Sequence, residues 1–378
     1  MLVAVAMLVS VSASSLFAAE GDGHLDIYFI DVEGGACTLF VSPSGESLVI
    51  DSGYPDNNGR DLKRILHVVR DVAGLKHIDH AAVTHWHADH YGNHAALSTQ
   101  IKIKNFWDRG IPDALVEDAQ FVARVADYRS ASQNKSKAVK PGDKLPLKSG
   151  KTPYSIQIVT ASREVIPNTG KPNPFAKLHK ALPEDKSDNA ASLSFLLTFG
   201  KFRFLCCGDL TWNIEAKLMT PNNPIGRVDM FMVTHHGLPS SNNPVLVRAI
   251  DPRVAVMCNG PTKGGAESVI KTLREGKSLK ALYQLHRNVK LGPKLQTPAK
   301  FIANGGQTDG CEGVWVKARV SPGGKRYTVQ IGPEGKPKRY KSRWFLCSGA
   351  RSGTLVLASS AVCLECDPAI GSLGVTSC

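Results

Sequence analysis

The sequence predicts an α/β fold built from layers of strands and helices. Short apolar runs bounded by polar residues, such as 78–83 and 228–233, are typical of buried strands. Residues 60–72 carry apolar side chains at helical spacing, as a helix that covers one face of a sheet does. Several predicted strands lead into a loop that contains His or Asp and then into a predicted helix. This repeated order of strand, loop and helix indicates α/β layers.

The first half of the chain alternates predicted strands and helices. A Ser-Pro-Ser-Gly turn at 42–45 joins two of the early strands. Residues 132–150 are rich in Lys, Gly and Pro and are expected to form a loop. We expect strands at 25–30, 37–41, 48–50, 78–83, 103–107 and 154–160, and helices at 60–72, at 94–97 and from 111 to about 130.

The second half contains one long irregular stretch and two predicted hairpins. Residues 161–188 show little periodicity, and because long loops in compact domains are often functional, we expect this one to overhang the functional site. The hairpins centre on Gly200-Lys201 and on the Ser-Pro-Gly-Gly stretch 321–324. We expect strands at 191–198, 202–206, 228–233, 254–257, 313–320 and 326–331, and helices at 212–219 and from about 265 to 274.

Length and composition suggest one large domain with appendages. The chain has 378 residues, and 42% of them are hydrophobic, which is enough for a sizeable core. Residues 1–19 hold an apolar run too short to span a bilayer, followed by small residues, and predict a secretory signal and an exported protein. No membrane span is expected in the mature chain. We expect a main domain at 20–310, a basic β-hairpin extension at 311–345 and a cysteine-containing tail at 346–378.

The charge balance favours anionic partners. The formal net charge is +13, as expected for a protein that meets nucleic acid, anionic lipid or a phosphorylated polymer. Residues 321–345 contain seven Lys or Arg and one Glu. Both a solvated hairpin and a nucleic-acid arm fit this segment, and a basic surface without a specific partner fits the whole chain. The sequence sets no oligomeric state.

The strongest chemical signal is the stretch 84–93, Thr-His-Trp-His-Ala-Asp-His-Tyr-Gly-Asn, directly after a predicted buried strand. His85 and His87 are two residues apart and point the same way in extended backbone. Asp89 and His90 follow after a turn and can face a second position. Imidazoles with carboxylates suit Zn²⁺ and, less selectively, Mn²⁺ or iron. The alternative is a His-rich loop or a group of hydrogen-bonded core histidines, but this pattern at a strand end favours a metal site.

Together with this motif, four further segments resemble a known family. They are 31–36 (Asp-Val-Glu-Gly-Gly-Ala), 48–53 (Leu-Val-Ile-Asp-Ser-Gly), 207–210 (Cys-Gly-Asp-Leu) and 233–237 (Val-Thr-His-His-Gly). From about residue 25 to about residue 304 the chain resembles the metallo-β-lactamase-fold hydrolases, and more narrowly the hydrolase domain of ComEC-type competence proteins. That branch usually reads D-V-G-Q-G-D in the first segment, so Glu33 and Ala36 are departures.

The resemblance implies a four-layer αββα sandwich with a dinuclear metal site. It assigns His85 and His87 to one metal. It assigns Asp89, His90 and one histidine of the pair His235-His236 to the other, with Asp209 bridging the two. The remaining histidine of the pair is expected to donate a hydrogen bond to a substrate oxygen. Asp51 is implied as an outer residue that orients a metal-bound histidine. The candidate catalytic residues are Asp89, Asp209 and His236.

One histidine of the family pattern is missing here. Between residues 95 and 208 the only histidine is His179, which lies between Lys177 and Lys180. Asp188 and Asn189 precede a predicted strand at the corresponding place. We therefore expect Asp188 or Asn189, and not His179, to face the metals directly or through water. Oxygen ligands bind Zn²⁺ less tightly than imidazole does, so one of two zinc positions should be weaker and accept Mn²⁺ or iron.

The expected reaction is hydrolysis by a hydroxide held between two cations. Such a site lowers the pKa of the bound water and neutralises an attacked anion, which phosphodiester cleavage requires. Together with the net charge, this favours an exported phosphodiesterase that acts on nucleic acid or on a phosphorylated wall or lipid component. Arg109, Ser240 and Lys263 are candidate substrate contacts. The alternatives are a lactamase or lactonase, and a metal-binding or nucleic-acid-binding module without catalysis.

Overall fold

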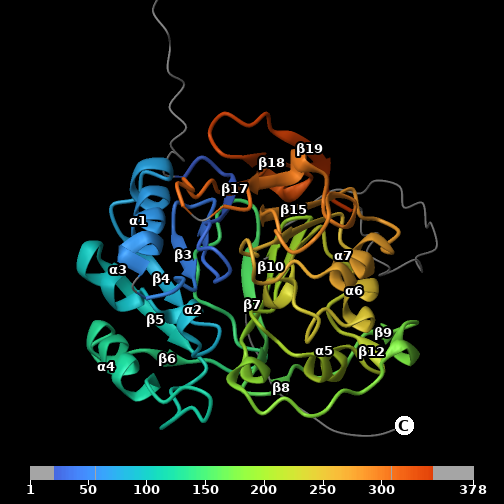
Figure 1. Cartoon of the computed structure of the whole chain (residues 1–378), viewed down its shortest axis with the longest axis horizontal. Helices are drawn as coiled ribbons and strands as arrows, with labels where there is room; N and C mark the ends of the chain where they lie inside the picture. The colour runs from blue at the N-terminus through green and yellow to red at the C-terminus, as the bar shows by residue number, and fades with distance from the viewer. Residues whose placement is uncertain (1–20, 56, 308, 344–378) are drawn as a thin grey trace, which may run out of the picture. The chain divides into compact units, whose positions relative to one another are not determined.

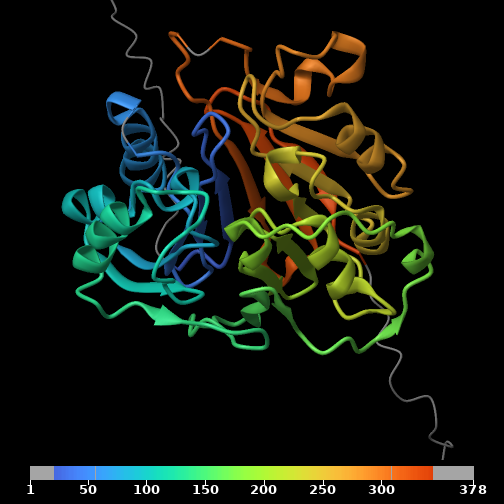
Figure 2. The ribbon, with the colours of Figure 1, turned by 60° about the horizontal axis from the view of Figure 1, so that its bottom comes forward.

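The computed structural model describes residues 21–55, 57–307 and 309–343. Two β-sheets pack face to face, and helices cover their outer faces (Figures 1 and 2). Helices α1, α3 and α4 lie beside the strands β3–β5 of the first sheet, and α5, α6 and α7 lie beside the second sheet. The predicted αββα sandwich is therefore confirmed.

The first sheet has nine strands among the described residues, in the order β19-β18-β17-β1-β2-β3-β4-β5-β6. Strands β3 to β6 run parallel to one another, and the other neighbours are antiparallel. The strand bounds are β1 Leu25–Phe29, β2 Thr38–Val41, β3 Ser47–Ile50, β4 Ile78–Ala82, β5 Ile103–Asp108, β6 Lys137–Ala138, β17 Val316–Val320, β18 Arg326–Ile331 and β19 Lys338–Lys341. The first and last strands of the described chain thus share one sheet.

The second sheet has eight strands in the described part of the chain, in the order β16-β15-β14-β13-β11-β10-β7-β8. Strands β11, β13, β14, β15 and β16 are parallel, as in doubly wound sheets. The bounds are β7 Tyr154–Ala161, β8 Glu164–Val165, β10 Ser194–Phe199, β11 Phe202–Cys206, β13 Met230–Met232, β14 Val254–Met257, β15 Ala281–His286 and β16 Ile302–Asn304. A separate short pair joins β9 (Lys171–Pro172) to β12 (Asn222–Asn223).

The helices are short and connect successive strands. Their bounds are α1 Arg60–Leu66, α2 Ala88–Tyr91, α3 His94–Gln100, α4 Phe121–Ala131, α5 Trp212–Met219, α6 Pro244–Ile250 and α7 Glu267–Arg274. A π-helical turn, His67–Val72, continues α1. Short 3₁₀ turns lie at Asn57–Gly59, Ala176–Leu178, Asp188–Ala191, Thr234–Gly237, Pro293–Leu295, Ala299–Phe301 and Pro322–Gly324. Asn243 caps α6 by accepting a hydrogen bond from the Val245 amide, and Pro244 follows the cap.

Apolar side chains fill three layers, as a four-layer sandwich requires. The central layer lies between the sheets and joins side chains such as Ile27 and Phe40 of the first sheet to Phe204 and Val256 of the second. A second layer packs the other face of the second sheet against α5, α6 and α7. Two smaller groups pack the first sheet against α1, α3 and α4. Each sheet is therefore apolar on both faces over much of its area.

Several expectations on secondary structure need correction. The helix expected from residue 111 begins only at Phe121, and residues 111–120 form turns with an isolated bridge between Leu115 and Asp118. Ile111 and Leu115 of this stretch pack against the group around Trp86 and Phe121, but the side chain of Val116 is fully exposed. Helix α6 and the strands β15, β16 and β19 were not expected. The α6 sequence Pro-Val-Leu-Val-Arg-Ala-Ile is apolar nearly all round, and such a short run does not distinguish a helix from a strand.

The predicted hairpin of β17 and β18 forms, and β17 pairs with β1 along its whole length. The hairpin therefore continues the first sheet. Two of its basic residues, Lys317 and Arg319, form ion pairs with Asp26 of β1. The expectations for residues 1–19 and for the tail 346–378 lie outside the described residues. Within the described part of the chain, no helix combines the length and the apolar character needed to cross a membrane.

Candidate metal centre

The candidate site forms where strands of both sheets end. Strand β4 leads into the loop with His85 and His87, β11 leads into Asp209, and β13 leads into the turn with His235 and His236. The carboxyl ends of parallel strands meet at one edge of a sheet, where α/β folds place their sites. The order of strands therefore brings together loops that are more than 100 residues apart in sequence.

Four buried side chains form the centre of the site: Asp89, His90, Asp209 and His236. Their potential ligand atoms all lie within 4.8 Å of one another. Nε2 of His90 and Nε2 of His236 each lie 3.2 Å from Oδ2 of Asp209, and Nε2 of His236 also lies 3.2 Å from Oδ2 of Asp89. Ligands about 2.0–2.2 Å from a tetrahedral cation are about 3.3 Å apart, so these spacings and this mixture of N and O donors fit a zinc-like ion.

His85 and His87 extend this group to one side. The His85 ring centroid lies 4.1 Å from that of His90 and 4.7 Å from that of His87. Nε2 of His85 is buried and has no hydrogen-bond partner among the described residues. A buried imidazole nitrogen without a partner is costly unless it binds a ligand. This orphaned atom fits a second metal position beside the four-residue group.

The carboxylate of Asp51 hydrogen-bonds to Nδ1 of His90, whereas Nε2 of the same ring lies beside Asp209. Its Oδ2 accepts a hydrogen bond from Nδ1 of His90 at 2.7 Å, and both of its oxygens accept hydrogen bonds from Thr84 at 2.8 Å. Because Nδ1 carries the proton, Nε2 of His90 is left as the ligand atom that faces Asp209. His236 is oriented in a similar way, since its Nδ1 donates to the carbonyl of Cys258 at 3.0 Å. Such outer hydrogen bonds fix the tautomer and the ring direction of a metal-binding histidine.

The turn after β13 separates the two adjacent histidines. His235 and His236 both have positive φ, 53° and 52°, which is uncommon for residues other than Gly. This places His236 within the four-residue group, whereas Nε2 of His235 lies 3.4 Å from Oδ2 of Asp209 and its Nδ1 lies 3.1 Å from the hydroxyl of Ser240. Gly264 allows the turn, because a Cβ there would lie 2.1 Å from the carbonyl oxygen of His236.

Lys263 is the cation nearest the four-residue group. Its Nζ lies 2.5 Å from Oδ2 of Asp89 and 3.2 Å from the hydroxyl of Tyr54. The loop after β1 supports Asp89 from the other side, since the amide of Ala36 donates to the Asp89 carbonyl at 3.1 Å. A Cβ on Gly35 would lie 2.5 Å from that carbonyl oxygen, which explains a glycine at this position.

Burial and neighbouring charges shift the pKa values of the buried Asp and His side chains of the site in different directions. Burial raises the pKa of Asp209, but the neighbouring imidazoles, His236 first, outweigh it and hold that pKa well below the ordinary carboxyl value. Burial lowers the pKa of His90, but Asp209 and Asp89 outweigh it and raise that pKa well above its ordinary value. Burial lowers the pKa of His85 well below its ordinary value, so His85 stays neutral, which is the form that binds metals.

The side chain of Asp188 contacts the backbone of the histidine motif at Trp86. Its Oδ2 accepts a hydrogen bond from the Trp86 amide at 2.6 Å, and its Oδ1 pairs with Arg109. Arg109 is therefore engaged with a carboxylate of the protein. Oδ1 of Asn189 is buried and has no hydrogen-bond partner within the described residues. His179 contacts the side chain of Asn243 at 3.0 Å.

One side chain that the sequence did not suggest reaches the site. Oε1 of Glu117 lies 3.1 Å from Nε2 of His87 and accepts a hydrogen bond from the Asp188 amide at 2.6 Å. Partial burial raises the pKa of Glu117, but the Asp188 amide and His87 outweigh it and lower that pKa. Glu117 lies in the stretch expected to be helical, and no spacing in the sequence links it to His87.

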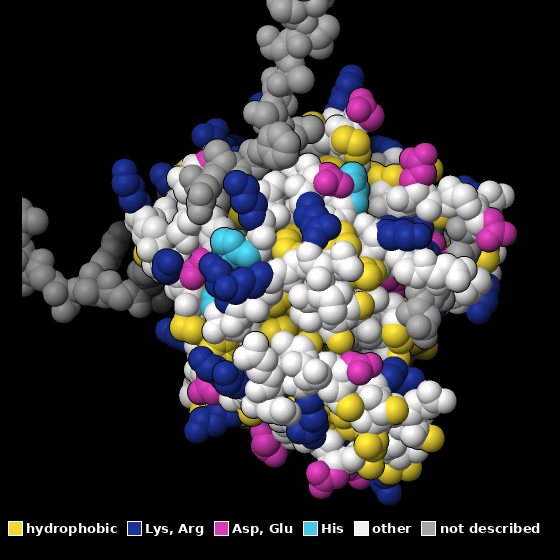
Figure 3. Space-filling view, turned by 90° about the vertical axis from the view of Figure 1, so that its left-hand side faces the viewer, with side chains coloured by type: hydrophobic (Ala, Val, Ile, Leu, Met, Phe, Trp, Pro, Cys, Tyr) yellow, Lys and Arg dark blue, Asp and Glu magenta, His cyan; other side chains and the backbone are white. Residues whose placement is uncertain are grey.

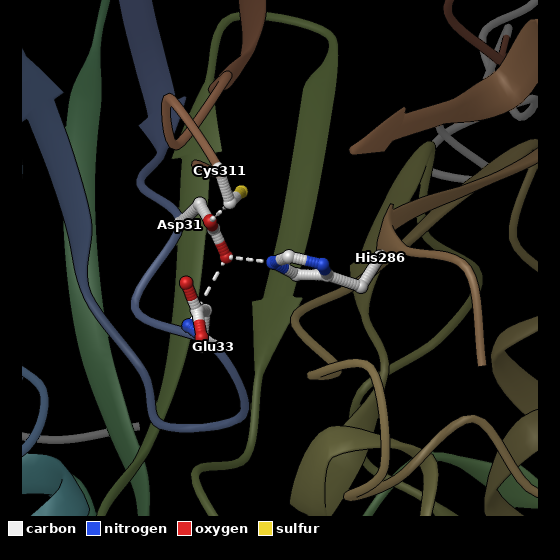
Figure 4. A group of neighbouring side chains, drawn as sticks. All are labelled: Asp31, Glu33, His286 and Cys311. Carbon is white, nitrogen blue, oxygen red and sulfur yellow. Dashed lines mark hydrogen bonds and ion pairs between the residues drawn. The ribbon is translucent and has the colours of Figure 1, made fainter. Parts of the chain in front are cut away.

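A second group of potential ligands has a different character. Asp31, Glu33, His286 and Cys311 lie close together (Figure 4), with ligand atoms within 4.8 Å of one another. However, Arg64 lies 2.9 Å from Oδ2 of Asp31 and 2.9 Å from Oε1 of Glu33, and His286 lies 2.8 Å from Oδ1 of Asp31. Protein cations thus already neutralise both carboxylates. This group is an ion-pair network that ties the loop after β1 to α1 and β15.

Residues 30–171 match the family model described as the Metallo-beta-lactamase superfamily, so this part of the chain carries a metallo-beta-lactamase superfamily domain. The match includes the histidine motif and ends before Asp209 and His236. A search of curated proteins finds no match.

Solved structures with similarity to this chain include two of the hydroxylase CmlA and one lactamase. A single-site mutant of the CmlA beta-hydroxylase is 15% identical over 69% of this chain and 52% of that chain, with a TM-score of 0.42. CmlA, a diiron beta-hydroxylase from Streptomyces venezuelae, is 16% identical over 62% of this chain and 44% of that chain, with a TM-score of 0.36. MEM-A1, a subclass B3 metallo-beta-lactamase from a soil metagenome library, is 14% identical over 71% of this chain and 78% of that chain, with a TM-score of 0.33. The chain spans about half the length of the two CmlA chains.

Proposed function

We propose that this chain, with its metallo-beta-lactamase superfamily domain, is a metal-dependent hydrolase that cleaves phosphodiesters at a dinuclear centre. The observation that carries the proposal is the buried group of Asp89, His90, Asp209 and His236, with the unpartnered Nε2 of His85 beside it. Two cations bound here would supply a hydroxide at neutral pH and neutralise charge on the attacked group. Zinc fits the donor set, and Mn²⁺ or iron fits the weaker position, which lacks the histidine of the family pattern.

The protein itself prepares the site for this chemistry. Asp51 holds His90 with Nε2 facing Asp209, and the carbonyl of Cys258 does the same for His236. The backbone of the turn keeps His235 on the other side of Asp209, where Ser240 hydrogen-bonds its Nδ1. Nε2 of His235 is therefore available to contact a substrate oxygen near Asp209. Asp51 and Cys258 directly follow the strands β3 and β14, so the sheets hold these two partners in place before any reaction.

An anionic substrate is favoured by the charges around the site. Both Lys263 and Arg109 form an ion pair with a carboxylate of the protein, Asp89 and Asp188 respectively. The side chain of Lys263 is 33% exposed and that of Arg109 is 11% exposed, so Lys263 is the better placed of the two to contact a phosphate oxygen. The formal net charge of +13 attracts anions at longer range. On the face beside α1, α3 and α4, Lys and Arg side chains are spread out and mixed with Asp and Glu (Figure 3). We therefore assign recognition of the phosphodiester to the site and not to a basic patch on that face.

The substrate class is nucleic acid or a phosphorylated wall or lipid component. The narrower resemblance to the ComEC-type hydrolase domain supports nucleic acid within this class. It rests on the segments 31–36, 48–53, 207–210 and 233–237, which include Asp51, Asp209, His235 and His236.

The test is a substrate panel on the purified full chain with its metal content measured. The protein is loaded with Zn²⁺ or Mn²⁺ and assayed with bis(p-nitrophenyl) phosphate, single-stranded DNA, a chromogenic cephalosporin and a lactone. Metal-dependent turnover of the phosphodiesters, lost on chelation, supports the proposal. Turnover of the cephalosporin or lactone alone would assign the site to the lactamase or lactonase class. Bound metal without turnover of any of the four would favour a non-catalytic module.

A further inference from the structure

The basic hairpin near the end of the described chain lies outside the metal centre. Its strands β17 and β18, together with β19, form one edge of the first sheet (Figure 1). Tyr327, Val329 and Tyr340 of these strands belong to the central apolar layer. Because side chains alternate between the two faces of a strand, Arg326 and Thr328 of β18 point to the outer face of the sheet.

Three arginines surround a hollow on this outer face. Thr328 pairs with Arg319 of β17 on one side and with Arg339 of β19 on the other. Arg326 lies two residues before Thr328, about 7 Å along the same strand. These side chains and His24 line a hollow of about 380 Å³. The register of the sheet thus brings together guanidinium groups from three strands.

Two of the three arginines keep their charge for a ligand. Arg319 forms ion pairs with Asp22 and Asp26. Among the described residues, no carboxylate forms an ion pair with Arg326 or with Arg339, and both side chains are exposed. A guanidinium group matches the geometry of phosphate and can bind it through two parallel hydrogen bonds. The hollow therefore suits a ligand that carries phosphate groups.

The hollow and the metal centre lie at opposite ends of β1. Arg319 pairs with Asp26, close to the start of this strand. The loop that supports Asp89 follows the other end of the strand, since the Ala36 amide donates to the Asp89 carbonyl. A strand of five residues is about 17 Å long. Only an extended ligand can therefore occupy both places at once.

We propose that this hollow binds phosphates of a nucleic-acid strand whose scissile phosphodiester lies at the metal centre. The inference rests on the proposed phosphodiesterase function and names a polymeric nucleic acid as its substrate. Arg326 and Arg339 are diagonal neighbours on adjacent strands, so their guanidinium groups can contact two successive phosphates of one strand. Contacts to phosphates carry no sequence information, so the binding should not depend on base sequence.

A nucleic-acid strand fits this place better than a lipid surface does. A bilayer is flat and meets side chains that protrude from a protein, whereas Arg326 and Arg339 line a recess that a single strand can enter. Charges that are only solvated are the competing explanation. That explanation predicts no more loss of binding from these two arginines than from any other two exposed cations of the chain.

The experiment compares the purified full chain with two double variants. Arg326→Gln with Arg339→Gln removes the two unpaired charges of the hollow. Arg129→Gln with Lys271→Gln is the matched control, because it removes two exposed charges from α4 and α7. The probe is a fluorescein-labelled oligothymidylate of about 20 nucleotides, longer than the distance it must span. Its phosphorothioate linkages keep the charge and resist hydrolysis.

Fluorescence anisotropy measures the affinity for the probe from about 0.05 to about 0.2 M NaCl. We expect the hollow variant to bind about 25-fold more weakly than wild type at about 0.1 M, because each phosphate contact on a single strand contributes about 0.7 to the salt slope. The slope of log affinity against log salt should become shallower by about 1.4. The control should keep the affinity and the slope of wild type.

Two further measurements accompany the binding assay. Thermal unfolding shows that the variants are folded, since the replaced side chains are exposed. Turnover of bis(p-nitrophenyl) phosphate should be equal in all three proteins, because this small substrate cannot span from the metal centre to the hollow. Vesicles of phosphatidylglycerol test the lipid surface as the ligand, and their binding should be the same in the hollow variant and in the control.

The results that would overturn the inference differ from those that would overturn the proposed function. Equal loss of DNA affinity in the hollow variant and the control, or no loss in either, would show that the hollow binds no strand, while turnover of the phosphodiester keeps the function. Loss of vesicle binding with unchanged DNA binding would assign the hollow to lipid. Loss of DNA affinity in the hollow variant alone, without phosphodiester turnover by any of the proteins, would leave the strand site standing and the proposed function wrong.

Discussion

Asp51 and His90 form a buried pair in which the histidine Nδ1 donates to the carboxylate at 2.7 Å. Asp51 directly follows β3, and His90 lies in α2, which follows the neighbouring parallel strand β4. Asp51 has a positive φ of 61°, and its second oxygen accepts from the Thr84 amide. The pair therefore fixes both the tautomer of His90 and the start of the histidine motif.

Replacing Asp51 by Asn should weaken metal binding without unfolding the protein. The amide cannot accept the His90 proton with the strength of a carboxylate, so the ring loses its fixed tautomer. We expect the metal affinity to fall about 10- to 100-fold, as for other outer partners of metal ligands. Titration with Zn²⁺ measures the change, and Asp71→Asn, at an exposed position, is the control. Unchanged affinity in Asp51→Asn would show that the pair serves only the fold.

The Asp209→Ala variant should lose activity and at least one metal. Its carboxylate lies 3.2 Å from the ligand nitrogens of both His90 and His236, so its loss opens the centre of the site. Elemental analysis and phosphodiester turnover measure the result, and Asp127→Ala on the exposed face of α4 is the control. Full metal content together with full turnover would contradict the dinuclear assignment.

Variants at 179, 188 and 189 separate the candidates for the missing histidine. His179→Ala should keep both metals, because His179 contacts Asn243. Asp188→Ala should weaken the His87 position, because it removes the bond to the Trp86 amide. Asn189→Ala should weaken it only if the buried amide oxygen faces the metals. The measurement is metal stoichiometry under limiting metal, and loss of a metal in His179→Ala alone would mean that the loop completes an ordinary site.

Lys263→Met should reduce turnover of anionic substrates while metal content stays near that of wild type. The ammonium group lies beside Asp89 and is 33% exposed, so it can reach a substrate oxygen. Hydrogen bonds to charged groups contribute about 1.5–3 kcal/mol, which corresponds to a loss of about 10- to 100-fold in kcat/KM. Lys271→Met on α7 is the control. Equal losses for charged and neutral substrates would argue against a substrate contact.

Because of Glu215, the free energy of unfolding should fall as the pH rises from the ordinary carboxyl pKa to about 8. Burial raises the pKa of this carboxyl to about 8, although the Asn243 amide, which donates to Oε2 at 2.6 Å, opposes the shift. Between its ordinary value and about 8, the folded chain holds a proton that the unfolded chain has released. Each pH unit in this window therefore costs up to about 1.4 kcal/mol of stability. Denaturant unfolding across this range should show a shallower slope for Glu215→Gln, and identical slopes would contradict the prediction.

The sequence by itself determined the layered fold and the places of the chemical groups along the chain. Apolar periodicity marks β4, β11 and β13 as buried strands, and the residue that follows a strand must lie at the edge of its sheet. His85, Asp209 and the pair His235-His236 could therefore be placed near one another without a structure. The αββα arrangement followed from the resemblance of the motifs, and the two packed sheets confirm it.

Only the tertiary structure decided which neighbouring side chains meet. The positive φ angles of His235 and His236, permitted by Gly264, place His236 and not His235 in the four-residue group. The turns at 111–120 place Glu117 beside His87, and Asp188 forms an ion pair with Arg109. Periodicity describes how a side chain faces relative to its own strand or helix. Contacts between side chains of different segments depend on the tertiary arrangement of the whole chain, and no local sequence pattern contains that arrangement.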